Sequence, residues 1–177
     1  MTMNSKLNVS LTATLIEALD LGERTAGITK KFSATLASGF AVGQADRIFQ
    51  DSRNLAPSAT ENLDLAGVLT DPFGALLTFV KIKGIYVAAV PLVTTPPTAP
   101  NINDVIVGAA AATPWSALLG ATGTVTLKPG SCFAAFAGEA DNVGWAVGAG
   151  ATDLLKIANS AGGTSVNYEI IVIGTSA

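Results

Sequence analysis

The chain has no histidine and a single cysteine, Cys132, among its 177 residues. A structural zinc site needs about four Cys or His ligands, so this supply excludes one. One cysteine also excludes a disulfide within the chain, and without histidine a cysteine nucleophile lacks its commonest base. Because Phe133 and Phe136 follow Cys132 closely, we expect its side chain to be buried as a small hydrophobe. We therefore expect no metal and no cofactor.

Charged residues are scarce as well, at 13% of the chain against 49% for hydrophobic residues. An ordinary soluble domain carries about 25% charged residues, so this chain must expose Ala, Val, Thr and Gly surface. Contiguous surface of that kind usually marks an interface. The basic residues form no stripe that would follow phosphates, and the longest apolar run, 85–93, is too short to span a membrane. We expect a protein covered by protein neighbours, with neither nucleic acid nor a membrane as partner.

The thirteen carboxylates are the remaining candidates for catalysis. Glu61 and Asp64 are close in the sequence, but on a strand they would point to opposite faces. A glycosidase needs two carboxylates held at a set separation over a sugar-binding cleft, and aromatic residues, at 6% of the chain, offer few stacking platforms. The sequence therefore predicts no catalytic residue and no enzyme.

Apolar and polar residues alternate along short stretches, which is typical of strands with one buried face. The alternation begins with the odd-numbered residues from Leu7 to Leu15, and it returns over 28–36 after a predicted loop over 20–27. Helix signals are few. Further strands are expected over 46–51, 60–65, 76–82, 85–90, 105–107, 122–127, 131–136, 143–147, 154–158 and 166–173.

Glycine and proline residues lie within and between these strands. Gly84 predicts a bulge, and residues 161–163 predict a hairpin connection before the final strand. The proline-rich segment 91–103 predicts a long surface loop, because proline removes donors from a sheet. About ten short strands with frequent turns predict an all-β antiparallel β-sandwich of jelly-roll type with little helix. We expect one domain over 1–177.

Four stretches of the chain are GQADRIFQD at 43–51, ATENLDLAG at 59–67, KIKGIYV at 81–87 and TSVNYEIIVIG at 164–174. They resemble small structural virion proteins of tailed bacteriophages, and the likeness covers most of the chain from about Leu7 onward. Such proteins include capsid cement, or decoration, proteins, among which a jelly-roll sandwich is common. The proline-rich loop departs from their usual pattern. The resemblance assigns no binding residue.

The resemblance implies a non-enzymatic cement protein on the capsid surface of a virion, made in the cytoplasm of the bacterial host. It would bind across major capsid subunits and stabilise the head. The alternative is a tail, connector or receptor-binding protein of the same virion. The implied partners are the major capsid protein and further copies of the chain, with a homotrimer favoured because cement proteins often occupy local threefold positions, and a dimer as the second choice.

We expect the contact surface to include the strand over 85–93 and the loop that follows. A segment stiffened by proline loses less entropy when it is ordered against a neighbour. Trp115 is expected to anchor either the core or an interface. The predicted interface residues are Ile85, Tyr86, Val87, Val90, Leu92, Val93, Pro96, Pro97 and Trp115.

Overall fold

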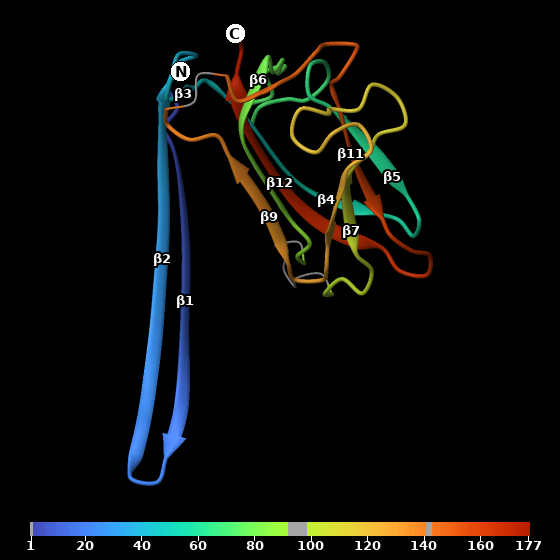
Figure 1. Cartoon of the computed structure of the whole chain (residues 1–177). Helices are drawn as coiled ribbons and strands as arrows, with labels where there is room; N and C mark the ends of the chain where they lie inside the picture. Colours follow the sequence, from blue (N-terminus) through green and yellow to red (C-terminus); the bar gives the residue numbers. More distant parts are fainter. Residues whose placement is uncertain (1, 92–98, 141–142) are drawn as a thin grey trace.

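The computed structural model describes residues 2–91, 99–140 and 143–177 (Figure 1). Strands joined by turns and loops make up these residues, and none of them forms a helix, so no helix there could cross a membrane. The predicted all-β fold is confirmed. The strands are β1 (Ser5–Leu19), β2 (Gly22–Ser38), β3 (Gln44–Ala45), β4 (Arg47–Leu55), β5 (Thr60–Asp64), β6 (Lys81–Ala88), β7 (Val105–Gly108), β8 (Thr124–Leu127), β9 (Cys132–Phe136), β10 (Trp145–Ala146), β11 (Leu154–Asn159) and β12 (Val166–Thr175).

Strands β4 to β12 form the body, a sandwich of two antiparallel sheets. In one sheet β6 lies between β12 and the pair β9 and β10, and β4 follows β12 at the edge. The other sheet has the order β5, β11, β7, β8. The pairing is nested, since β4 pairs with β12, β5 with β11, β6 with β9 and β7 with β8. Rolling up one long antiparallel hairpin produces this nested order in two packed sheets.

The core lies between the two sheets because alternate residues of every strand point inward. On β12, Tyr168, Ile170 and Val172 are buried, whereas Ile171 and Ile173 lie on the outer face and are partly exposed. The alternation that predicts strands in the sequence therefore also describes which residues of the body are buried. The sheet formed by β4, β12, β6, β9 and β10, called the large sheet below, has its outer face turned away from this core.

The predicted bulge at Gly84 is confirmed. Ile173 pairs with Gly84 but Gly174 pairs with Ile82, so Lys83 is the extra residue of β6. A Cβ at position 84 would lie 2.7 Å from the ring of Phe136, so a larger residue there would have to displace that ring.

The predicted hairpin connection at 161–163 is wrong. Strand β11 pairs with β5 and β7, whereas β12 pairs with β4 and β6, so residues 161–163 carry the chain from one sheet to the other. The strand expected over 76–82 is also shorter than predicted, because β6 begins only at Lys81.

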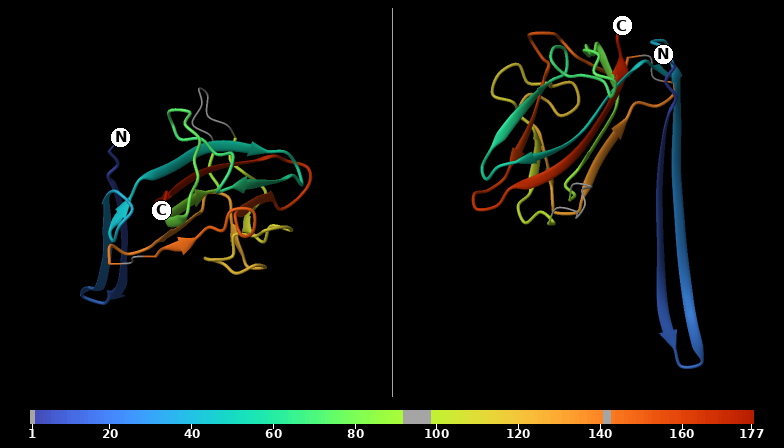
Figure 2. Two further views of the ribbon diagram at one scale, coloured as in Figure 1. Left: turned by 90° about the horizontal axis from the view of Figure 1, so that it is seen from above. Right: turned by 180° about the vertical axis from the view of Figure 1, so that it is seen from behind.

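Strands β1 and β2 form a hairpin that projects from the body (Figure 1). They pair along their whole length, from Ser5 opposite Leu36 to Leu19 opposite Gly22, and only Asp20 and Leu21 form the turn. The loop predicted over 20–27 is therefore wrong. At about 3.4 Å per residue, the 15 residues of β1 span about 50 Å. Figure 2 shows that this hairpin, called the arm below (residues 5–38), runs past the end of the body.

Candidate assembly surface

The arm has two chemically different faces. Residues directly opposite each other in an antiparallel hairpin share a face, so the register places Val9 beside Phe32 and Asn8 beside Ser33 on the other side. The apolar face of the arm consists of Leu7, Val9, Leu11, Ala13, Leu15 and Leu19 of β1 with Ala26, Ile28, Phe32 and Ala34 of β2. The polar face carries Lys6, Asn8, Ser10, Thr12 and Thr14 of β1 with Thr25, Thr29, Lys31, Ser33 and Thr35 of β2.

The apolar face of the arm is exposed over most of its length. Leu15 is 74% exposed, and Leu21 at the tip is fully exposed. The sequence predicts a buried face for this strand, and within the single chain that prediction is wrong because the described residues of the body do not cover this face beyond the root of the arm. A two-stranded hairpin alone is at best marginally stable in water, and a contiguous exposed apolar surface marks an interaction site.

Among the described residues, the body holds the arm at its root. Ala34 and Leu36 are buried there, and the Glu139 carboxylate accepts a hydrogen bond from the Thr35 N–H at 2.5 Å. The Ala37 N–H donates to the carbonyl of the loop before β3 at 2.9 Å. Because Ala34 belongs to the apolar face, these contacts turn that face toward the outer face of the large sheet.

An apolar groove of 250 Å³ lies where the arm meets the large sheet, and we call it the root groove. Burial, followed by the nearby Cys132 and Glu169, raises the pKa of Tyr86, so this side chain of the groove is neutral at physiological pH. Leu7 belongs both to the groove and to the apolar face of the arm, which makes the two surfaces continuous. The groove is lined by Lys6, Leu7, Gly84, Ile85, Tyr86, Phe136, Ile171 and Ile173.

Charge is distributed unevenly along the arm. The half nearer the body carries three lysines, and the tip carries three carboxylates with one arginine. At the tip Arg24 and Glu17 are opposite neighbours and form an ion pair, so the tip keeps a net negative charge. The lysines are Lys6, Lys30 and Lys31, and the unpaired carboxylates of the tip are those of Asp20 and Glu23.

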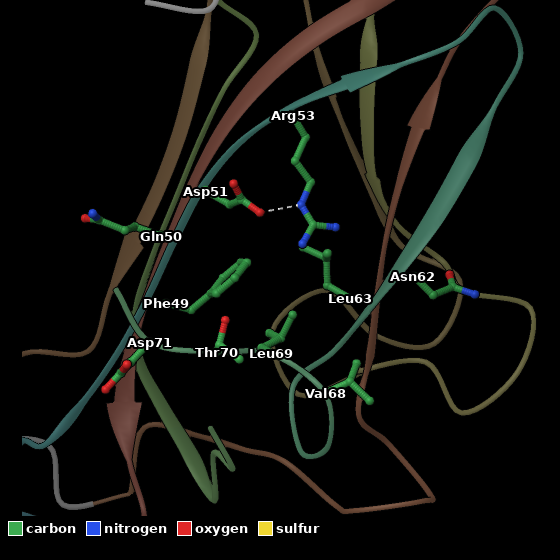
Figure 3. Close-up of a pocket in the computed structure, with 10 residues that line it drawn as sticks. All are labelled: Phe49, Gln50, Asp51, Arg53, Asn62, Leu63, Val68, Leu69, Thr70 and Asp71. Atoms are coloured by element: carbon green, nitrogen blue, oxygen red, sulfur yellow. Dashed lines mark hydrogen bonds and ion pairs between the residues drawn. The ribbon is translucent and has the colours of Figure 1, made fainter. Parts of the chain in front are cut away.

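A second candidate is a polar cluster beside a pocket on β4 (Figure 3). Arg53 Nε donates to Asp51 Oδ2 at 2.7 Å, and Arg53 Nη1 donates to Glu61. The Tyr168 hydroxyl donates to the other oxygen of Glu61 at 2.7 Å. Both oxygens of Glu61 are therefore occupied by donors.

The electrostatics of this cluster indicate a structural role. Burial by itself lowers the pKa of Arg53, but hydrogen bonds to Asp51 and Glu61 outweigh it and raise the pKa. Burial and the hydrogen bond to Glu61 raise the pKa of Tyr168. Since Arg53, Glu61 and Tyr168 come from β4, β5 and β12, the cluster joins the two sheets at their edge.

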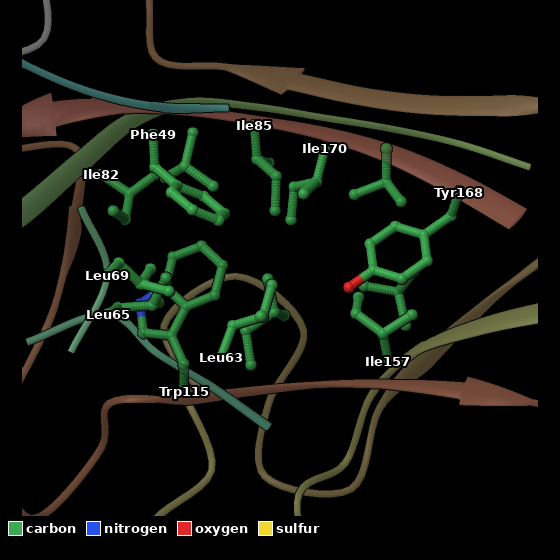
Figure 4. Close-up of a cluster of buried hydrophobic side chains, with 14 of the residues drawn as sticks. Phe49, Leu63, Leu65, Leu69, Ile82, Ile85, Trp115, Ile157, Tyr168 and Ile170 are labelled. Carbon is green, nitrogen blue, oxygen red and sulfur yellow. The ribbon is translucent and has the colours of Figure 1, made fainter. Parts of the chain in front are cut away.

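Three of the predicted interface residues are in the core. Figure 4 shows Ile85 and Trp115 among the buried side chains, and Val87 is also fully buried. Strand β6 lies between two other strands, so its alternate residues point inward, and the Trp115 indole N–H donates to the Ala146 carbonyl at 2.9 Å. The interface prediction is wrong for these three residues.

The other predicted interface residues have different positions. Tyr86 lies on the outer face of the large sheet and lines the root groove, and Val90 is partly exposed. Leu92, Val93, Pro96 and Pro97 lie outside the described residues.

Cys132 is exposed, so the prediction that its side chain is buried is wrong. It pairs with Ala88 and shares the outer face of the large sheet with Ala134 and Phe136, whereas Phe133 and Ala135 pack against the core. A neighbouring phenylalanine therefore says little about burial in a strand, where adjacent residues point to opposite faces.

The arm is the feature that sequence reasoning missed. The available signal was that the alternations over 7–15 and 28–36 are the first two in the chain and are equally long, as the strands of one hairpin are.

Within residues 2–91, 99–140 and 143–177, no group of three or more His, Cys, Asp or Glu side chains is placed to hold a metal ion. Comparison with protein-family models, with curated proteins and with solved structures finds no match to this chain.

Proposed function

We propose that this chain is a non-enzymatic structural protein of a virion, a cement protein that stabilises the capsid by bridging its subunits. The observation that carries the proposal is the arm, about 50 Å long, whose apolar face is exposed over most of its length while the body already has a complete core. Because the body has its own core, such a hairpin adds no stability unless a neighbouring molecule covers its apolar face. The capsid as the setting rests on the four stretches that resemble tailed-phage virion proteins.

The composition supports the same role. A seam between subunits buries both surfaces, and a charge buried there without a partner is costly. Apolar area contributes roughly 25 cal/mol per Å² before the cost of ordering is subtracted. The apolar face of the arm carries Lys30 and, near the tip, the ion pair of Arg24 with Glu17, and its other residues from Leu7 to Leu19 are apolar or glycine.

The partners in this proposal are the major capsid protein and further copies of the chain. The body would be held on the shell, and the arm would reach across to a neighbour. A protein that binds only the intact shell raises its stability by mass action. An arm of this kind would equally suit a tail, connector or receptor-binding protein of the same virion, so the position on the particle discriminates between these functions.

The test uses virions purified with and without this chain. Particles without it should release DNA at a lower temperature, and adding back the wild-type chain should restore the original value. The double substitution Val9→Ser and Phe32→Ser on the apolar face should not restore it. The matched pair Thr12→Ser and Thr29→Ser on the polar face should restore it as the wild type does.

Two results would contradict the cement function. Complete and depleted particles that release DNA at the same temperature would show that the chain does not stabilise the head. Antibody labelling confined to tails in electron micrographs would favour the tail or receptor-binding function instead.

A further inference from the structure

We propose that the arm pairs with the arm of a second copy, antiparallel and apolar face to apolar face, about a two-fold axis near Ala13. In this dimer Leu21, at the tip of each arm, enters the root groove of the other copy. This inference rests on the proposed function, in which the arm binds a neighbouring molecule, and it names that neighbour as a second copy of the chain.

The lengths of the surfaces fit this arrangement. Along β1 the apolar face runs from Leu7 to Leu19, so its centre is Ala13. An antiparallel copy centred there brings each tip to the root of the other arm, where the root groove lies. An apolar cavity of about 150 Å³ binds a benzene ring, so a groove of 250 Å³ has room for the Leu21 side chain. Leu21 is otherwise fully exposed.

The charges of the arm also favour the antiparallel direction. An antiparallel copy places the net negative tip near the half of the other arm that carries the lysines. On the packed faces Glu17 comes close to Lys30, whereas Glu23 and Lys31 lie on the outward polar faces. Arms that ran side by side in the same direction would place lysines beside lysines and carboxylates beside carboxylates, and like charges in contact are unfavourable. A threefold ring of arms has that parallel arrangement. The charge pattern therefore favours the dimer over the homotrimer.

The area that would be buried is sufficient for a specific dimer. Two strands, each about 5 Å wide and about 50 Å long, present roughly 500 Å² on one face, so two packed faces bury at most roughly 1,000 Å². Specific protein interfaces begin at about this size. The entry of the two tips into the two root grooves adds to it.

The first experiment measures the oligomeric state of the isolated chain by analytical ultracentrifugation. The wild type should be a dimer, and Leu15→Ser on the apolar face should weaken the dimer roughly tenfold to a hundredfold. Ile16→Ser is the matched control, because Ile16 is a neighbouring exposed aliphatic residue, at 59% against 74% for Leu15, on the opposite face. It should leave the dimer unchanged. Leu21→Ser should weaken the dimer as Leu15→Ser does.

The second experiment tests the direction of pairing by cross-linking, in a Cys132→Ser background. A short bismaleimide is needed because packed sheets lie about 10 Å apart, beyond the reach of a disulfide. Ala13→Cys should cross-link to itself, whereas Thr12→Cys, on the polar face at the same height, should not. Val9→Cys and Glu17→Cys, equally far from Ala13, should cross-link when mixed but not when each is alone.

Several outcomes would overturn the dimer. In ultracentrifugation, the wild type would stay monomeric up to a chain concentration of about 100 µM, or Ile16→Ser would weaken the dimer and Leu15→Ser would not. In the cross-linking experiment, Val9→Cys would cross-link to itself. Because the measurements use the isolated chain, each of these outcomes leaves the particle-melting test of the cement function unaffected. If the dimer forms as described but particles with and without the chain release DNA at the same temperature, the cement function is refuted and the dimer is not.

Discussion

Replacing Tyr168 with phenylalanine should reduce stability at neutral pH and remove a loss of stability that the wild type shows in alkali. The Tyr168 side chain is fully buried, and its hydroxyl donates to Glu61 at 2.7 Å. Hydrogen bonds to charged groups contribute about 1.5 to 3 kcal/mol, so Tyr168→Phe should lower the free energy of unfolding by about 2 kcal/mol at pH 7. Phenylalanine keeps the ring packing of the core.

The alkaline effect follows from the raised pKa of Tyr168. Its causes are burial first and the hydrogen bond to Glu61 second. Above the ordinary value of 10.0 the unfolded chain loses this proton while the folded chain keeps it. The unfolded state then binds fewer protons, so stability falls as pH rises, by about 1.4 kcal/mol per pH unit. The advantage of the wild type over Tyr168→Phe should therefore vanish about 1.5 units above pH 10.

The assay is urea denaturation of both chains from about pH 8 to about pH 11.5, with the difference in free energy of unfolding plotted against pH. All other titratable groups are the same in both chains, so their contributions cancel in the difference. A difference that stays constant over this range would show that the Tyr168 hydroxyl titrates near its usual value in the folded chain, and the reasoning would be wrong. Tyr86→Phe should alter the alkaline slope less, because Tyr86 is partly exposed.

Three further substitutions or reactions test particular parts of the fold. Gly84→Ala should lower the free energy of unfolding by about 1 to 3 kcal/mol because its Cβ would lie 2.7 Å from an aromatic ring, whereas Gly27→Ala, with no atom within 4 Å, should be nearly neutral in the same urea titration. Asn101→Ala removes two hydrogen bonds of 2.7 Å to the backbone of Asn167 and should cost about 2 to 3 kcal/mol; a smaller loss would mean that water replaces the amide. Cys132 should react with a thiol reagent in the folded chain as quickly as in urea, and slow labelling would place another surface over it.

The positions of most strands of the body could be predicted from the sequence. The alternation over 154–158 becomes β11 (Leu154–Asn159), and that over 166–173 becomes β12 (Val166–Thr175). Glycine was equally informative at position 84, where it permits the bulge and the approach of Phe136. These features depend on neighbouring residues or on the two-residue period of a strand, and both are visible in the chain itself.

The candidate site was only partly predictable. The low charge and the exposed small residues indicated an interface, but they did not locate it, and the strand chosen for it, 85–93, begins inside the large sheet. Charge and composition are properties of the whole chain. They carry no information on which strand ends up between two others and which one leaves the body.

The sequence by itself determined most of the strands, the fold class and the alternation of apolar and polar residues along them. Only the tertiary structure decided what covers those faces. The odd-numbered residues of β1 and the even-numbered residues of β12 show the same period, yet Ile170 is buried in the core and Leu15 is exposed on the arm. A two-residue period records which side of a strand avoids water, whereas burial depends on contacts between segments far apart in the chain. The same distinction explains why residues 161–163 connect the two sheets and why the apolar face of the arm is exposed in the single chain.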